Sequence, residues 1–258
     1  MLDSHEYFSA LAAGSDRLEN VIALRRVDST NDLCRRLLTE QPGEDGQSGV
    51  TLVSAWEQLG GKGRERRSWL SPPGQGVYAS LLVPEPEPAV IARLPFVVPV
   101  AIADFLSREL GVSCGLKWPN DILVDGNKLG GILIEVISRA ERPSAAIIGF
   151  GVNVRGVTDL PRAGSLDRHM DTTMRVGNLT MCLADTVLSR MNGKDRLDEL
   201  VGEWSARSVH ELGDHLTCRV GDRVIEGAFG GFDSSGAIRL THEGRVTKLA
   251  AGELIPGA

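Results

Sequence analysis

The sequence predicts an α+β fold in which helices flank one mixed sheet, with a small β-barrel at the C-terminal end. The chain has 258 residues, which is enough to bury a sizeable core without disulfides or metals. Its middle is rich in short β-forming runs separated by glycine or proline turns. From about Leu212 the chain changes to closely spaced short runs broken by turns, as in small antiparallel barrels. We therefore predict a domain over 1–210 and a second over 211–258.

Residues 1–26 are predicted to form a short, polar and partly helical lead. Thr30 is a candidate helix cap because its hydroxyl can accept a hydrogen bond from an unpaired backbone amide. That helix is expected to continue to Leu38 and to end at residues 41–43. The β-rich runs that follow are predicted to form one sheet. They cover residues 50–56, 76–83, 122–124, 129–137 and 145–154.

Two longer segments have the apolar spacing of helices. Residues 89–110 form one helix with prolines in its first half, and 179–206 form one long or two shorter helices. The C-terminal strands span only about 45 residues, a size at which an isolated core is marginal. We therefore expect them to dock on the larger domain.

Composition and charge exclude several classes of protein. A formal net charge of −6 is opposite to the basic surface that DNA or RNA binding requires. The four cysteines are scattered, which fits a reducing cytoplasm. The acidic N-terminus is unlike a secretory signal, and the longest apolar run, 95–103, is too short to span a bilayer. The expected location is therefore the cytoplasm, with no membrane and no DNA partner.

Residues 58–69 are the first segment that indicates chemistry. Three glycines let the backbone approach an anion closely. Four cations accompany one acid, and in an acidic protein such a cluster favours a negatively charged ligand. The cations are Lys62, Arg64, Arg66 and Arg67. Because residues 60–68 have almost no apolar anchor, we expect them to be mobile without ligand and ordered by it. A solvated basic loop is the alternative for the arginines alone.

Residues 117–121 and 125–133 form the second such segment. Asp125-Gly126-Asn127 suits a tight turn, so antiparallel pairing can bring Lys117, Asp121 and Lys128 to one end of the sheet. A lysine can hold a carboxylate or phosphate, and Asp121 can hold a Mg²⁺ ion that bridges phosphate oxygens. An edge hairpin with solvated lysines is the alternative.

Small residues mark a third segment, Gly149-Phe150-Gly151-Val152-Asn153, which ends a strand and lets the backbone pass close to a ligand. It lacks the third glycine of a dinucleotide-binding fingerprint, because Val154 stands there. Ser29-Thr30-Asn31 alone is typical of a helix start.

Together, in this order, these segments resemble the biotin protein ligase family, in its monofunctional form. The resemblance runs from Ser29 to Asn153, and the C-terminal FDSSGAIRL and AAGELI segments are similar to that family's SH3-like terminal barrel. Only 28 residues precede Ser29, too few for the DNA-binding domain of some members. The resemblance implies a catalytic domain like that of class II aminoacyl-tRNA synthetases.

The implied reaction has two steps. Biotin and MgATP give biotinyl-5′-AMP and pyrophosphate, and the biotinyl group then passes to a lysine of a biotin carboxyl carrier domain. The alternatives are a lipoate or octanoate ligase or transferase of the same superfamily, and a protein that binds biotin or biotinyl-AMP without turnover.

The resemblance also implies roles for individual residues. Lys128, Arg64, Arg67 and Lys117 would be catalytic, and Asp121 would hold the metal. Biotin would be bound by Ser29, Thr30, Asn31, Gln58, Gly61, Lys62, Arg64, Lys128 and Gly131. ATP and the adenylate would be bound by Arg64, Arg67, Trp69, Lys117, Asn120, Asp121 and Asn153.

One departure concerns the loop. The family pattern has a glycine where this chain has Arg66, so if that position needs a positive φ the substitution costs on the order of 1 kcal/mol. Leu59 and Gly60 also stand where the family usually has a polar residue and an alanine.

Overall fold

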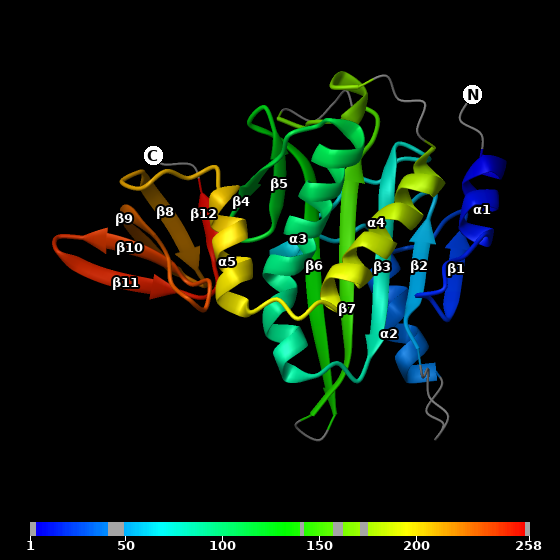
Figure 1. Cartoon of the computed structure of the whole chain (residues 1–258), viewed down its shortest axis with the longest axis horizontal. Coiled ribbons are helices and arrows are strands. Elements are labelled where there is room, and N and C mark those ends of the chain that lie inside the picture. Colours follow the sequence, from blue (N-terminus) through cyan, green and yellow to red (C-terminus); the bar gives the residue numbers. More distant parts are fainter. Residues whose placement is uncertain (1–3, 41–48, 140–141, 157–161, 171–174, 256–258) are drawn as a thin grey trace.

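The computed structural model describes residues 4–40, 49–139, 142–156, 162–170 and 175–255. Its main sheet has the strand order β1-β2-β3-β7-β6-β5-β4, in which β1 and β2 are parallel and the other neighbours antiparallel (Figure 1). The sheet is therefore mixed, as predicted. Its strands are β1 Asn20–Leu24, β2 Thr51–Ala55, β3 Gly76–Pro84, β4 Gly115–Lys117, β5 Asp121–Val124, β6 Asn127–Arg139 and β7 Arg142–Asn153.

Helices cover both faces of this sheet. The helices are α1 Ser4–Ala12, α2 Thr30–Glu40, α3 Pro88–Leu110, α4 Val176–Met191 and α5 Leu197–Ala206. α3 and α4 lie over one face, where most of the core is, and α2 lies over the other (Figure 1). Under α2 a small apolar cluster forms around Cys34, Val53 and Leu82. Burial raises the pKa of the Cys34 thiol to about 12, so it acts as an apolar core group.

A second sheet, of order β11-β10-β9-β8-β12, is built from the C-terminal residues. Its strands are β8 His215–Val220, β9 Arg223–Phe232, β10 Ile238–His242, β11 Arg245–Leu249 and β12 Glu253–Ile255. Phe232 packs edge-on against Trp204 of α5 with ring centroids 4.8 Å apart. The ring of Phe96 on α3 fills the space beside Gly236. This sheet therefore docks on the helices of the larger unit, as expected from its size.

The N-terminal region differs from the sequence prediction, whereas the segment 179–206 agrees with one of its two predicted alternatives. The lead over 1–26 contains a strand, because Asn20–Leu24 pairs with β2 at the edge of the main sheet. Its five residues are flanked by charges, which hid the strand signal. α1 contributes the buried Tyr7, whose hydroxyl lies 2.6 Å from that of Ser54. The segment 179–206 is two helices, and the predicted stop at 41–43 lies outside the described residues.

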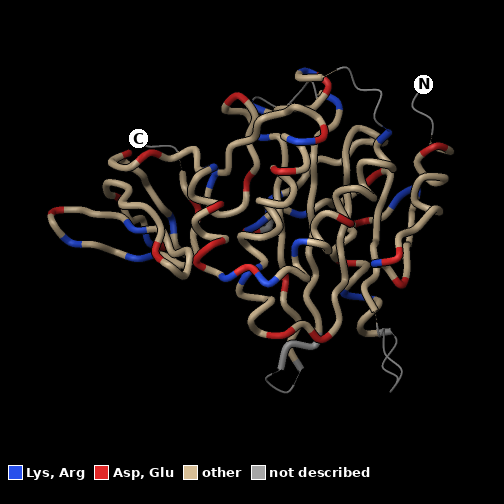
Figure 2. The backbone as a smooth tube through the Cα atoms, viewed as in Figure 1, with Lys and Arg blue, Asp and Glu red and all other residues tan. Residues whose placement is uncertain are grey.

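α3 is long and apolar enough to cross a membrane by length and composition. The prediction of no membrane-spanning segment was based on the longest uninterrupted apolar run, 95–103, which covers only part of this helix. Within its most apolar window, 56% of the residues are buried inside the protein. Its apolar side chains pack in the main core, which accounts for this composition. Elsewhere in the described chain, residues of both charge signs are spread over the helices, strands and loops (Figure 2).

Candidate functional site

One pocket collects most of the residues that the sequence singled out. It lies where the start of α2, the loop 58–69, the β5–β6 hairpin and β12 meet. Among the predicted site residues, those that line it are Ser29, Thr30, Asn31, Gln58, Lys62, Arg64, Arg67, Trp69, Lys117, Asn120, Asp121, Lys128 and Gly131. Gly61 and Asn153 are not among the lining residues. Because the sequence segments are far apart in the chain, only the fold brings them together.

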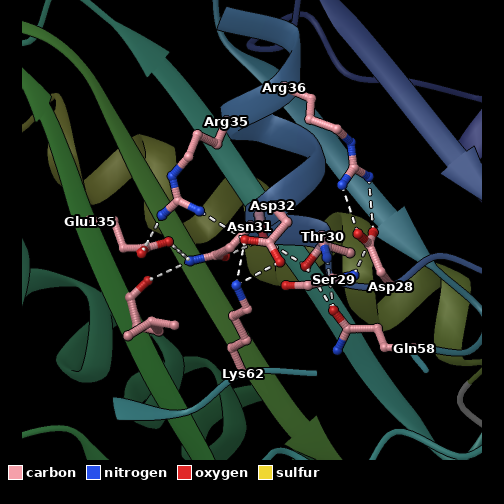
Figure 3. Close-up of polar contacts among 12 residues, drawn as sticks. Asp28, Ser29, Thr30, Asn31, Asp32, Arg35, Arg36, Gln58, Lys62 and Glu135 are labelled. Atoms are coloured by element: carbon pink, nitrogen blue, oxygen red, sulfur yellow. Dashed lines mark hydrogen bonds and ion pairs between the residues drawn. The ribbon is translucent and has the colours of Figure 1, made fainter. Parts of the chain in front are cut away.

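The floor of the pocket, defined here as Thr30, Asn31, Gln58 and Gly149, is held by buried and partly buried hydrogen bonds, and Ser80 supports it from behind. The Ser80 hydroxyl lies 2.7 Å from Thr30 Oγ1 and 2.6 Å from Asn31 Oδ1. The Thr30 amide donates to Gln58 Oε1 at 2.9 Å, and the Thr30 hydroxyl donates to the same oxygen at 3.2 Å (Figure 3). The predicted capping role of Thr30 is wrong, since α2 begins at Thr30 and this hydroxyl contacts Gln58. Its side chain instead shapes the floor.

Two glycines of β7 make room for site side chains. A Cβ on Gly149 would lie 2.2 Å from Asn31 Oδ1, and one on Gly151 would lie 2.7 Å from the Trp69 ring. Both approaches are closer than a real Cβ allows. In the structure these glycines admit Asn31 and Trp69, and both glycines also line the pocket. Their predicted close approach to a ligand stays a prediction.

The rim of the pocket, defined here as Lys62, Arg64, Arg67, Lys117 and Lys128, supplies five cations. Three carboxylates line the pocket with them: Glu65, Asp121 and Glu253. Cations therefore outnumber acids here, in a chain whose overall charge is −6. Clefts lined by one sign of charge concentrate ligands of the opposite sign. This arrangement favours an anionic ligand.

Lys128 is held from several sides. The hairpin turn before it has positive φ at Asp125 (47°) and Gly126 (72°), as in the turns that match strand twist. This turn pairs β5 with β6, so that Lys128 Nζ lies 2.7 Å from Asp121 Oδ1. The same Nζ lies 5.5 Å from the centre of the Trp69 ring, a cation–π contact. The predicted meeting of Lys117, Asp121 and Lys128 is confirmed, because Lys117 is the register partner of Asp121.

The loop 58–69 has more contacts than its sequence suggests. The Gly63 amide donates to the Arg67 carbonyl at 2.8 Å, and the Trp69 amide donates to the Gly61 carbonyl at 2.8 Å. Lys62 Nζ lies 2.6 Å from Asp32 Oδ2. The positive φ falls on Glu65, at 53°. Whether the loop is mobile without ligand stays a prediction.

Glu253 of β12 reaches the rim and contacts Arg67, and it also lies 3.1 Å from Arg219. Burial is the largest single influence on this carboxyl and raises its pKa. The hydrogen bonds with Arg67 and Glu65, together with the charges of Arg67 and Arg219, outweigh burial, so the pKa of Glu253 is lowered. Sequence reasoning missed Glu253, since nothing in the AAGELI segment shows where the C-terminal sheet docks. A conspicuous acid in an otherwise apolar strand was the available signal.

Gly61 and Asn153, the two predicted site residues that do not line the pocket, contact residues that do line it. Asn153 Nδ2 donates to the carbonyls of Lys128 at 3.3 Å and Gly164 at 3.0 Å. A Cβ on Gly61 would lie 2.4 Å from the Trp69 carbonyl. Both therefore position Lys128 and Trp69, and their predicted contacts with ligand stay a prediction.

No cluster of three or more metal-ligating side chains occurs within the described part of the chain. Asp121 is a single carboxylate beside two lysines. Mg²⁺ is commonly held by one or two carboxylates together with substrate phosphates. The residues present therefore fit a Mg²⁺ ion that arrives with a phosphate ligand.

The comparisons with known proteins agree with this geometry. Residues 23–153 match the biotin/lipoate A/B protein ligase family. The biotin–[acetyl-CoA-carboxylase] ligase of Paracoccus denitrificans is 31% identical, over 91% of this chain and 99% of the relative. The bifunctional ligase/repressor BirA of Salmonella typhimurium is 29% identical, over 98% of this chain and 78% of the relative. A biotin protein ligase from Aquifex aeolicus, solved with biotin and ATP, has TM-score 0.75 and 25% identity, with coverage of 92% and 98%.

Proposed function

Because the chain belongs to the biotin/lipoate A/B protein ligase family, we propose that it is an ATP-dependent biotin protein ligase. It activates biotin as biotinyl-5′-AMP and transfers the biotinyl group to a lysine of a biotin carboxyl carrier domain. The observation that carries this proposal is the rim: five cations around a pocket whose floor is an uncharged hydrogen-bonded surface.

The first step joins two anions, and the rim supplies what that needs. A biotin carboxylate oxygen attacks the α-phosphorus of ATP, the bond to the β-phosphate bridge oxygen breaks, and pyrophosphate leaves. Fixed cations lower the repulsion between the two anions and stabilise charge on the leaving group. We assign Lys128 to the biotin carboxylate and the new acyl phosphate, and Lys117 to the phosphates.

In the second step the amine of the carrier lysine attacks the acyl carbon, AMP leaves, and an amide is formed. The mixed anhydride hydrolyses if water reaches it, so the loop 58–69 must shield it. We assign this shielding to Arg64 and Arg67, with Trp69 as the apolar surface beneath the acyl phosphate.

Several finer assignments belong to the same proposal. We infer a Mg²⁺ ion held by Asp121 and the ATP phosphates, a catalytic domain of the class II aminoacyl-tRNA synthetase type over 1–210, and an SH3-like barrel over 211–258. The open order of the C-terminal sheet, with β11 and β12 at its edges, is compatible with such a barrel. The proposed location is the cytoplasm.

The test is direct. The protein is incubated with MgATP, an isolated carrier domain, and either labelled biotin or labelled lipoate, and covalent label and pyrophosphate are measured. We expect biotin label on the carrier lysine and release of pyrophosphate. Lipoate label would make it a lipoate ligase, and tight biotin binding with no pyrophosphate would make it a binding protein. Omission of Mg²⁺ should abolish turnover.

A further inference from the structure

A chain of alternating charges connects the loop 58–69 to the pocket floor. Lys62 Nζ lies 2.7 Å from Asp32 Oδ1, and Arg35 Nη1 donates to the same oxygen at 2.8 Å. The second arm of Arg35 lies 2.5 Å from Glu135 Oε1. Glu135 Oε2 then accepts a hydrogen bond from Asn31 Nδ2 at 2.9 Å (Figure 3). Asp32, Arg35 and Glu135 therefore connect Lys62 of the loop to Asn31 of the floor.

This cluster is electrically balanced only while Lys62 is docked. Asp32 and Glu135 carry two negative charges, and Arg35 supplies one positive charge. Lys62 supplies the other. If the loop moved away, one negative charge would remain uncompensated beside a pocket that must receive anions. Electrostatics therefore favours the docked loop.

The two partners of this pair differ in how they are held. Asp32 sits in the first turn of α2, where a carboxylate also interacts favourably with the helix dipole. α2 is fixed by apolar packing through Cys34. The Asp32 side chain is 19% exposed and the Lys62 side chain 47% exposed. The more exposed cation of the loop is therefore paired with the less exposed acid of a packed helix.

We propose that Asp32 is a positioning residue, which holds the loop 58–69 over the pocket by docking Lys62 and so keeps the acyl-adenylate from escaping. Asp32 is not among the residues that line the pocket, so it acts through Lys62. The nearest backbone tie of the loop to the segment before α2 is the Gly60 amide, which donates to the Asp28 carbonyl at 2.8 Å. Gln58, at the start of the loop, also bonds Thr30 at the start of α2. Lys62 is the second side-chain link between the loop and α2, and it lies closer to the loop's cationic residues.

This inference rests on the proposed function, and the variants separate the two. Asp32→Asn removes the charge with little change of shape. Asp32→Glu restores the charge. Asp28→Asn is the matched control, because Asp28 forms a comparable exposed pair with Arg36, at 2.6 and 2.9 Å, outside the pocket.

The first measurement needs no turnover. Trypsin cleavage at residues 62–67 is followed in the ligand-free full chain. We expect Asp32→Asn to be cut about five to ten times faster than wild type, and Asp28→Asn to be cut at the wild-type rate. A wild-type rate for Asp32→Asn would overturn the proposal whatever reaction the protein catalyses.

The second measurement is the release of biotinyl-AMP into solution from enzyme loaded with biotin and MgATP. We expect release about five- to tenfold faster for Asp32→Asn, recovery to within about twofold for Asp32→Glu, and little change in kcat for adenylate formation. Lys62→Gln should release biotinyl-AMP at least as fast as Asp32→Asn, and the double variant should release it no faster than Lys62→Gln alone. Additive effects would show that Asp32 does not act through Lys62. If wild type forms biotinyl-AMP and Asp32→Asn retains it normally, the inference fails while the proposed function stands.

Discussion

The floor of the pocket is held mainly by hydrogen bonds between buried or partly buried uncharged groups, with Glu135 as a charged partner of Asn31, whereas the rim contains ion pairs between partly exposed side chains. Ser80 is fully buried between Thr30 and Asn31, which are themselves 4% exposed. On the rim, by contrast, the Lys128 side chain is 39% exposed and that of Arg67 is 55% exposed. Buried polar groups are expensive to leave unpaired, while exposed ion pairs contribute little to stability.

This difference indicates that the floor selects the shape of the ligand, whereas the rim selects its charge. Breaking a hydrogen bond of the floor would leave a buried polar group unpaired, which costs free energy. The floor therefore keeps one shape and restricts the shape of the ligand. The rim can exchange a protein carboxylate for a ligand phosphate or carboxylate at small net cost. Substitutions on the floor should therefore lower both stability and affinity, and those on the rim should lower activity alone.

The largest effect is expected for Lys128→Ala. Loss of the cation at the reacting carboxylate should reduce adenylate synthesis by about 10²- to 10³-fold, because this charge is used mostly in the transition state. The free energy of unfolding should change by less than about 1 kcal/mol, since the pair with Asp121 is partly exposed. Pyrophosphate release and thermal denaturation measure the two quantities. Unchanged pyrophosphate release would remove Lys128 from the mechanism.

Gly149→Ala tests the floor. Its methyl group would press on the Asn31 amide, so we expect a loss of about 2 kcal/mol in stability and at least tenfold weaker biotin binding. Gly202→Ala is the matched control, because nothing lies within 4 Å of a Cβ there and helix α5 should gain slightly. Chemical denaturation and biotin titration measure both variants. Normal biotin affinity in Gly149→Ala would show that the floor does not shape the site.

Arg64→Gly tests the rim at the loop. We expect biotinyl-AMP to leak about tenfold faster and to label bystander lysines, with stability unchanged, because Arg64 is assigned to close the site. Labelling of an added unrelated protein measures the leak. Retention equal to that of wild type would count against a shielding role.

The smallest effect concerns His210, which lies behind the rim. The segment before it pairs with β4, and its Nε2 is buried with no hydrogen-bond partner among the described residues. Burial lowers the pKa of His210, and the nearby charge of Lys117 lowers it further, while Asp214 raises it. As pH falls through about 6.5, the ordinary pKa of histidine, the unfolded chain takes up a proton first, so stability decreases.

The size of this effect can be measured against a variant. Between pH 7.5 and 5.5 we expect the melting temperature of wild type to fall by about 1 °C more than that of His210→Gln. Parallel curves for the two proteins would show that His210 does not titrate in this window.

Much of the fold could be predicted from the sequence because its signals are local, whereas the floor residues were singled out through the resemblance to a known family. The β5–β6 hairpin follows from Asp125-Gly126-Asn127, and the strands of the main sheet follow from apolar runs between turns. β1 could not be recognised in the same way, because five residues between charges resemble a helix end as much as a strand.

What the sequence could not supply are contacts between segments that meet only after folding. The pairing of Lys62 with Asp32 depends on how the loop lies against α2. Gly149 and Gly151 were correctly picked out, but their neighbours, two side chains of the protein itself, were visible only in three dimensions.

The contact between Arg67 and Glu253 has a consequence for how the protein is made. Arg67 belongs to a segment that is synthesised before the strands from β3 onward, whereas β12 is the last of the described strands to be synthesised. A chain that ended before β12 would lack both this contact and the part of the pocket lining that Glu253 and Leu254 supply. The pocket is therefore completed only when this last strand has been made and has paired with β8.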